Sequence, residues 1–157
     1  MTRAWISAGS NVEREHNIRQ AIETLQQAFG VLVLSPIYRT RAEGFEGEDF
    51  LNLVIGVDTE LSPGELRQRL REIEDRQGRV RGENKYASRT LDLDLLTWGD
   101  LVDQSQGIPR DEILKYAFVL KPLADVAPDQ NYPGTHKTFG ELWAEFPRRG
   151  NMQQVLL

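Results

Sequence analysis

Leucine and aspartate alternate through residues 90–96, which read Thr-Leu-Asp-Leu-Asp-Leu-Leu. Successive side chains of a β-strand point to opposite faces of a sheet, so Leu91, Leu93 and Leu95 would share one face and Asp92 and Asp94 the other. The alternation predicts a strand over residues 91–98 with a buried leucine face and an outward carboxylate face. Such a strand requires a sheet with an apolar side against which other elements pack.

Hydrophobic spacing and turn residues predict the elements around this strand. We expect strands at residues 4–8, 31–34 and 50–59, with pairing of the second extending to Tyr38, and a turn at residues 9–11. We expect helices at residues 17–29 and from the capping box Ser62-Pro63-Gly64-Glu65 to about residue 77. Residues 79–88 read as an exposed loop. The second half is expected to be mostly irregular because four prolines interrupt it: Pro109, Pro122, Pro128 and Pro133. One short helix is expected near residues 138–146.

The predicted order β-α-β-β-α-β matches a split βαβ, ferredoxin-like unit. We therefore predict an α+β fold with a mostly antiparallel sheet and with the helices packed on one face of that sheet. A chain of 157 residues fits one domain, so residues 1–157 are expected to form a single domain.

Composition excludes several functional classes. The chain has no cysteine, which excludes disulfides, thiolate metal sites and a cysteine nucleophile. Its net charge of −5 argues against nucleic acid as a partner. No apolar run approaches the ~20 residues of a membrane span, and the N-terminus lacks a signal-peptide core, so we predict a cytoplasmic protein without a membrane partner. No segment demands self-association, and we expect a monomer.

The two aspartates are a candidate metal site. On a strand, Asp92 and Asp94 would lie about 6.5–7 Å apart at their Cα atoms. Carboxylates at that distance repel each other unless a cation lies between them, and Mg²⁺ is often held by one or two carboxylates together with substrate phosphates. The alternative is an ordinary half-exposed strand, although aspartate is disfavoured in strands.

Basic residues are concentrated just before the aspartates. Eight of the 19 lysine and arginine residues lie between Arg67 and Arg89, which suggests an anionic ligand, although a solvated helix face continuing into a loop has the same composition. Four of them could meet phosphate oxygens: Arg79, Arg81, Lys85 and Arg89. The chain has no Walker A loop and no G-x-G-x-x-G. These residues alone favour a magnesium-dependent phospho- or nucleotidyltransferase whose nucleotide site is not one of these glycine-rich loops.

Several short motifs follow one another in a fixed order: Gly9-Ser10-Asn11, Tyr38-Arg39-Thr40, Phe50-Leu51-Asn52, Ile73-Glu74, Gly78-Arg79-Val80-Arg81, residues 89–94 and 118–123, and Ala127-Pro128. Each motif is modest alone, but their order and spacing together are specific. The set resembles the 6-hydroxymethyl-7,8-dihydropterin pyrophosphokinases of folate synthesis. The resemblance runs from about Trp5 to Pro133.

This resemblance implies an enzyme that transfers the β,γ-pyrophosphoryl group of ATP to the hydroxymethyl oxygen of a reduced pterin and releases AMP. It implies two Mg²⁺ ions held by Asp92 and Asp94, with Arg79 and Arg89 steadying the charge that shifts during transfer. The positions that the resemblance assigns to ATP binding are Glu74, Arg81, Lys85, Arg110 and Lys115.

The resemblance also implies a pterin site with two stacking rings, an amide that reads the pterin edge, and backbone contacts. The positions are Phe50 and Phe118 for the rings, Asn52 for the amide, and Thr40 and Glu43 for the backbone contacts. From the residues alone, plain core packing of both phenylalanines is the simpler interpretation.

The chain departs from the family pattern near the nucleotide. The family usually has Gly-Pro before the arginine of its metal motif, where this chain has Ala87-Ser88. The family usually has a histidine where this chain has Arg110, and a later family arginine falls near Lys115 and Tyr116. Two alternatives to the ordinary enzyme remain: a divergent paralogue acting on another reduced pterin, and a pterin- or nucleotide-binding protein that has lost the chemistry.

Overall fold

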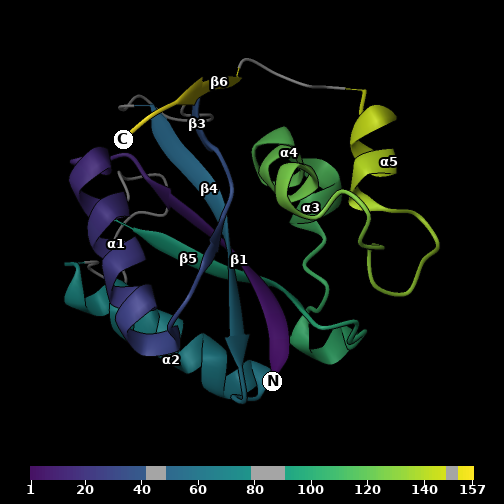
Figure 1. The fold of residues 1–157 in the computed structure, drawn as a ribbon, viewed down its shortest axis with the longest axis horizontal. Helices are drawn as coiled ribbons and strands as arrows, with labels where there is room; N and C mark the ends of the chain where they lie inside the picture. The colour runs from purple at the N-terminus through teal and green to yellow at the C-terminus, as the bar shows by residue number, and fades with distance from the viewer. Residues whose placement is uncertain (42–48, 79–90, 148–151) are drawn as a thin grey trace.

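The structure, a computed structural model, describes residues 1–41, 49–78, 91–147 and 152–157. Within these residues, six strands form one antiparallel sheet in the order β5-β1-β4-β3-β6, and the short β2 pairs with β4 (Figure 1). The strands are β1 (Thr2–Ser10), β2 (Val33–Leu34), β3 (Ile37–Thr40), β4 (Phe50–Thr59), β5 (Asp92–Trp98) and β6 (Met152–Val155). The predicted turn at residues 9–11 is wrong in part, because Gly9 and Ser10 continue β1 and pair with β4.

Helices cover both faces of this sheet (Figure 1). The helices are α1 (Arg14–Phe29), α2 (Pro63–Arg76), the 3₁₀ turn η1 (Gln104–Gln106), α3 (Glu112–Lys115), α4 (Ala117–Val126) and α5 (Phe139–Ala144). The sequence predicted helices on one face only, and this is wrong. The second face also carries apolar side chains, Trp5, Val54 and Leu96, and these are buried together with residues of α4 and α5.

The first face holds the core that the alternating sequence predicted. Leu91, Leu93 and Leu95 are 0%, 5% and 2% exposed and pack with the buried residues of α1 and α2. The predicted α+β arrangement with a mostly antiparallel sheet is confirmed. Along the chain the elements follow in the order β1, α1, β4, α2 and β5, with the short β2 and β3 between α1 and β4.

Helix α2 begins as its sequence predicts. Ser62 Oγ accepts a hydrogen bond from the Glu65 amide at 3.2 Å, and the Glu65 carboxylate accepts one from the Ser62 amide at 2.9 Å. This capping box satisfies two amides that the helix itself leaves unpaired, and Pro63 follows at the first helical position. The helix then packs along β5, the edge strand that carries the two aspartates.

The second half of the chain is more helical than predicted. Pro122 lies inside α4, where a proline costs about 3 kcal/mol. Val119, Leu120 and Leu123 are almost fully buried. Each such side chain stabilises by about 1.5–3 kcal/mol, so their burial outweighs the proline. None of the described helices is long and apolar enough to cross a lipid bilayer.

Polar contacts fix α4 to the sheet. The Tyr38 hydroxyl on β3 donates a hydrogen bond to the Asp125 carboxylate, and burial together with that contact raises the pKa of Tyr38. Lys121 Nζ lies 2.6 Å from the other Asp125 oxygen. These contacts hold the helix whose first turn carries Phe118.

Candidate active site

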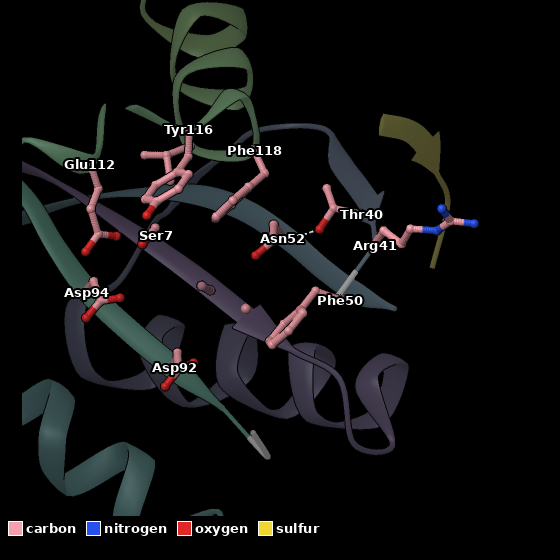
Figure 2. Close-up of a pocket in the computed structure, with 13 residues that line it drawn as sticks. Ser7, Thr40, Arg41, Phe50, Asn52, Asp92, Asp94, Glu112, Tyr116 and Phe118 are labelled. Atoms are coloured by element: carbon pink, nitrogen blue, oxygen red, sulfur yellow. Dashed lines mark hydrogen bonds between the residues drawn. The ribbon is translucent and has the colours of Figure 1, made fainter. Parts of the chain in front are cut away.

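A cavity of about 280 Å³ opens on the second face of the sheet, beside α3 and the start of α4 (Figure 2). Residues of β1, β3, β4 and β5 form its floor. Its lining comprises Ser7, Ala8, Gly9, Thr40, Arg41, Phe50, Asn52, Asp92, Asp94, Glu112, Tyr116, Phe118 and Val119. The structure thus brings together six residues that the sequence singled out: Thr40, Phe50, Asn52, Asp92, Asp94 and Phe118.

Strand pairing positions the two aspartates. Asp92 lies opposite Gly9 and Asp94 opposite Ser7 on the neighbouring β1. Both carboxylates project from the same face of β5 toward the cavity (Figure 2). The shared face predicted from the alternating sequence is therefore confirmed.

The Asp94 carboxyl lies in an acidic neighbourhood. Burial raises its pKa to about 6; Arg110 opposes this shift, whereas the carboxylates of Asp92, Glu112 and Glu74 add to it. A bound cation would relieve this accumulation of negative charge. Within the described residues, no group of three or more ligating side chains is arranged to hold a metal. Two carboxylates completed by phosphate and water oxygens are the ligand set that Mg²⁺ usually takes, so the aspartate pair fits this ion.

Two rings from different elements border the other end of the cavity. Phe50 comes from β4 and Phe118 from α4, and both are half-buried (Figure 2). Tyr116 stacks on Phe118 with ring centroids 5.0 Å apart and an interplanar angle of 23°. Because both rings line a cavity and keep exposed surface, stacking on a flat ligand is a better interpretation of them than plain core packing.

Asn52 is held in one orientation at the floor of the cavity. Its Nδ2 donates to Thr40 Oγ1 at 2.8 Å (Figure 2). Its Oδ1 lies only 2.7 Å from the position that a Cβ on Gly9 would occupy, so a glycine at this position leaves room for the amide. A fixed amide of this kind presents a defined hydrogen-bonding pattern to a ligand edge.

A second cavity of about 390 Å³ adjoins the first and shares Asp92, Asp94 and Glu112 with it. The remaining lining residues are Arg67, Leu70, Arg71, Glu74, Leu93, Leu95 and Arg110. Three arginines therefore face this second cavity, whereas the first cavity has three aromatic rings and one arginine, Arg41, among its described lining residues. The aspartate pair lies where an arginine-lined cavity meets a cavity bordered by aromatic rings.

Arg110 lies at this boundary. Its Nη2 is 2.7 Å from the Glu112 carboxylate and 3.8 Å from the Asp94 carboxylate. Hydrogen bonding and attraction to these carboxylates raise the pKa of Arg110 despite its burial. Its Nε is buried without a hydrogen-bond partner among the described residues. The guanidinium thus lies close to the Asp94 carboxylate and also lines the second cavity.

Glu74 has a structural partner in addition to its place in the second cavity. The side chain is 6% exposed, and its carboxylate accepts a hydrogen bond from the Leu93 amide at 2.8 Å. Leu93 lies between the two aspartates on the edge strand, so Glu74 ties α2 directly to the segment that carries them.

The remaining predicted residues are five that lie outside the described part of the chain, and Lys115. Glu43, Arg79, Arg81, Lys85 and Arg89 lie outside the described residues. Lys115 is exposed, and its Nζ is 3.1 Å from the Asp111 carboxylate. It lines neither cavity, because the next residue, Tyr116, is the one that turns toward the first cavity.

Sequence reasoning missed several lining residues. Arg67 and Arg71 are spaced i, i+4 and share the face of α2 that carries the predicted Glu74, a signal that could have been found. Glu112 gave no such signal, because its place depends on how the chain after β5 returns over the sheet. Ser7 reaches the cavity because β1 pairs with β5, which places it opposite Asp94.

Comparison with known proteins bears on the activity. A sequence model of the family described as 7,8-dihydro-6-hydroxymethylpterin-pyrophosphokinase (HPPK) matches residues 5–128. The chain belongs to the HPPK family. An HPPK relative from Pseudomonas aeruginosa is 37% identical over 158 residues, which cover 94% of each chain. A relative from Methylorubrum extorquens is 37% identical over 135 residues, which cover 82% of this chain and 85% of the relative. Both are named 2-amino-4-hydroxy-6-hydroxymethyldihydropteridine pyrophosphokinase.

Solved structures share the HPPK fold. Plasmodium falciparum HPPK-DHPS, wild type with SDX-DHP, superposes with a TM-score of 0.71 at 13% identity, covering 93% of this chain and 44% of that one. The wild type with pteroate gives 0.72 at 13% identity, covering 92% and 42%. This chain therefore spans less than half of those proteins, and at such identity the likeness concerns the fold alone.

Proposed function

We propose that this HPPK-family chain transfers the β,γ-pyrophosphoryl group of ATP to the hydroxymethyl oxygen of 6-hydroxymethyl-7,8-dihydropterin in folate biosynthesis. The observation that carries the proposal is the position of Asp92 and Asp94, which line both cavities at their junction. A triphosphate in the arginine-lined cavity and a pterin in the aromatic cavity would meet at these carboxylates. The pyrophosphokinase names of the bacterial relatives support the same reaction.

The first cavity would bind the pterin. Phe50 and Phe118 would hold the bicyclic ring, and the fixed amide of Asn52 would read its polar edge. Thr40 orients that amide and would contribute with Glu43 to the pterin side. The pterin hydroxymethyl group would then point toward the aspartates.

The second cavity would receive the phosphates of ATP. Arg110 and Glu74 line it. Arg81, Lys85 and Lys115 are proposed as further ATP contacts, and Arg79 and Arg89 as residues that steady the charge during transfer. Arginine suits this task because its planar guanidinium makes paired hydrogen bonds to phosphate oxygens.

The reaction is a single displacement at the β-phosphorus. The hydroxymethyl oxygen forms a bond to that phosphorus and loses its proton, the bond from the β-phosphorus to the oxygen of the α-phosphate breaks, and AMP leaves. Two Mg²⁺ ions, when bound, would neutralise the triphosphate and align it with the acceptor. Asp92 and Asp94 would hold the ions, and Arg110 would keep Asp94 oriented.

We also propose a cytoplasmic, monomeric protein. The cytoplasm supports the reaction because ATP is available there. Light scattering coupled to size-exclusion chromatography measures the mass in solution, and a mass near the 17.9 kDa of one chain is expected. A mass of twice that value would contradict the monomer.

The test is product identification. The purified protein is incubated with ATP, Mg²⁺ and 6-hydroxymethyl-7,8-dihydropterin, and nucleotides and pterins are separated by chromatography. Equal amounts of AMP and pterin diphosphate are expected. AMP formed only with a different reduced pterin would indicate a divergent paralogue, for which Arg110 and Tyr116 are the candidate causes. Binding of both substrates without product would indicate a binding protein.

A further inference from the structure

Arg67 occupies an unusual place on α2. Its side chain is half-buried and lines both the second cavity and a third cavity of about 680 Å³, which runs along η1 and the segment before α3. Its Nη2 lies 4.0 Å from the position of a Cβ on Gly107, so the guanidinium reaches the tip of this segment. The side chain therefore spans the groove between α2 and the loop after β5.

This guanidinium has no protein partner among the described residues. No hydrogen bond or ion pair engages Arg67 there, whereas the nearby Arg110 is paired with Glu112. Burial and the positive charge of Arg110 lower the pKa of Arg67, with Asp94 opposing that effect. A bound anion would offset both the burial of this guanidinium and the repulsion from Arg110.

The neighbouring arginine on the same helix shows the ordinary alternative. Arg69 is on the solvent side, 47% exposed at its side chain, with its Nε 3.7 Å from Glu72. Arg67 instead follows the buried Leu66 and shares the helix face of Arg71 and Glu74, which line the second cavity. A solvated helix face accounts for Arg69 but not for Arg67.

We propose that Arg67 binds phosphate oxygens of the nucleotide, as an anion-binding residue of this site that the sequence motifs do not include. Arg67 and Arg110 both line the second cavity, which the aspartate pair also lines, and the third cavity, so a polyphosphate that extends from the aspartates into the third cavity would pass both guanidiniums. The inference rests on the proposed function for the identity of the anion. The free amino groups of the guanidinium would make charge-assisted bonds to its oxygens.

Isothermal titration calorimetry with Mg²⁺ and α,β-methylene-ATP tests the proposal. The link between the α- and β-phosphates of this analogue is not cleaved, so binding is measured without reaction. Arg67→Gln is expected to weaken binding about tenfold to a hundredfold, the range for loss of a charged hydrogen bond. Arg67→Lys, which keeps the charge, is expected to lie between Arg67→Gln and the wild type. Arg69→Gln is the matched control and should bind like the wild type. Pterin affinity should stay unchanged in all three variants.

Equal nucleotide affinity of Arg67→Gln and Arg69→Gln would overturn the proposal. Thermal melting of each variant shows whether it folds, and if Arg67→Gln does not, Arg67→Lys and Arg67→Met provide the same comparison. The outcome is separate from that of the proposed function. A wild type that forms AMP and pterin diphosphate, with Arg67→Gln unaffected, refutes only this inference. A wild type that binds the nucleotide through Arg67 but forms no product refutes only the proposed reaction.

Discussion

Replacing Glu74 tests how the strand that carries the aspartates is held. In Glu74→Ala, the Leu93 amide loses the carboxylate that accepts its hydrogen bond at 2.8 Å. Both residues are nearly buried, at 6% and 5% exposure, so water cannot easily replace the acceptor. An unsatisfied buried donor costs about 1–3 kcal/mol. In a domain of this size each kcal/mol lowers the melting temperature by roughly 2–4 °C, so a decrease of roughly 2–12 °C is expected.

Urea denaturation followed by tryptophan fluorescence measures this loss. Glu74→Gln keeps an acceptor oxygen and should lose less stability than Glu74→Ala. Glu72→Ala is the matched control, because Glu72 is an exposed residue of the same helix and should change the free energy of unfolding by less than about 0.5 kcal/mol. Equal stabilities of the Glu74→Ala and Glu72→Ala variants would refute the reasoning. A raised KM for ATP in Glu74→Gln with unchanged stability would show that the carboxylate acts on the nucleotide instead.

Three further predictions concern the first cavity and its supports. Gly9→Ala would place a Cβ 2.7 Å from Asn52 Oδ1, so the amide should shift and the KM for the pterin should rise roughly two- to tenfold in steady-state assays; an unchanged KM contradicts this. Tyr38→Phe removes the hydroxyl bonded to a partly buried carboxylate and should lower the free energy of unfolding by about 1.5–3 kcal/mol, whereas Tyr116→Phe, at an exposed position, should not. Equal urea midpoints of the two variants would disprove it. Because the pKa of Asp94 is raised to about 6 in the folded protein, above its unfolded value of about 3.9, ionisation destabilises the metal-free fold as pH rises through this window. Asp94→Asn should therefore melt at a higher temperature than the wild type in EDTA at about pH 7.5, but not at about pH 4, and parallel melting profiles across pH would count against this account.

The sequence predicted those parts of the fold that local chemistry decides. The capping box at Ser62 begins α2 where expected, and the alternation around Leu93 predicted both a buried face and a shared carboxylate face. The helix α4 was missed because Pro122 was taken as a break, whereas the burial of its neighbours outweighs the cost of the proline. Tertiary packing of this kind cannot be read from the spacing of a short segment.

In the candidate site, too, local sequence predicted some residues, whereas others depend on tertiary packing. Asp92 and Asp94 were found from their own strand, and Phe118 only through the resemblance to a family. Glu112 and Tyr116 were missed, because they reach the cavity through the path of the chain after β5. Lys115 was predicted in the place of a family arginine, and only the turn into α4 determines whether Lys115 or Tyr116 faces the cavity.

The central claim is that pyrophosphoryl transfer takes place at the aspartate pair between the two cavities. The measurement is AMP formation by the wild type, Asp92→Asn, Asp94→Asn and the exposed control Asp100→Asn, with pterin binding followed by fluorescence in the same preparations. We expect the wild type and the Asp100 variant to form AMP and pterin diphosphate equally, and the two site variants to lose at least about a hundredfold in rate while still binding pterin. Full activity in either site variant, or ADP in place of AMP from the wild type, would contradict the account.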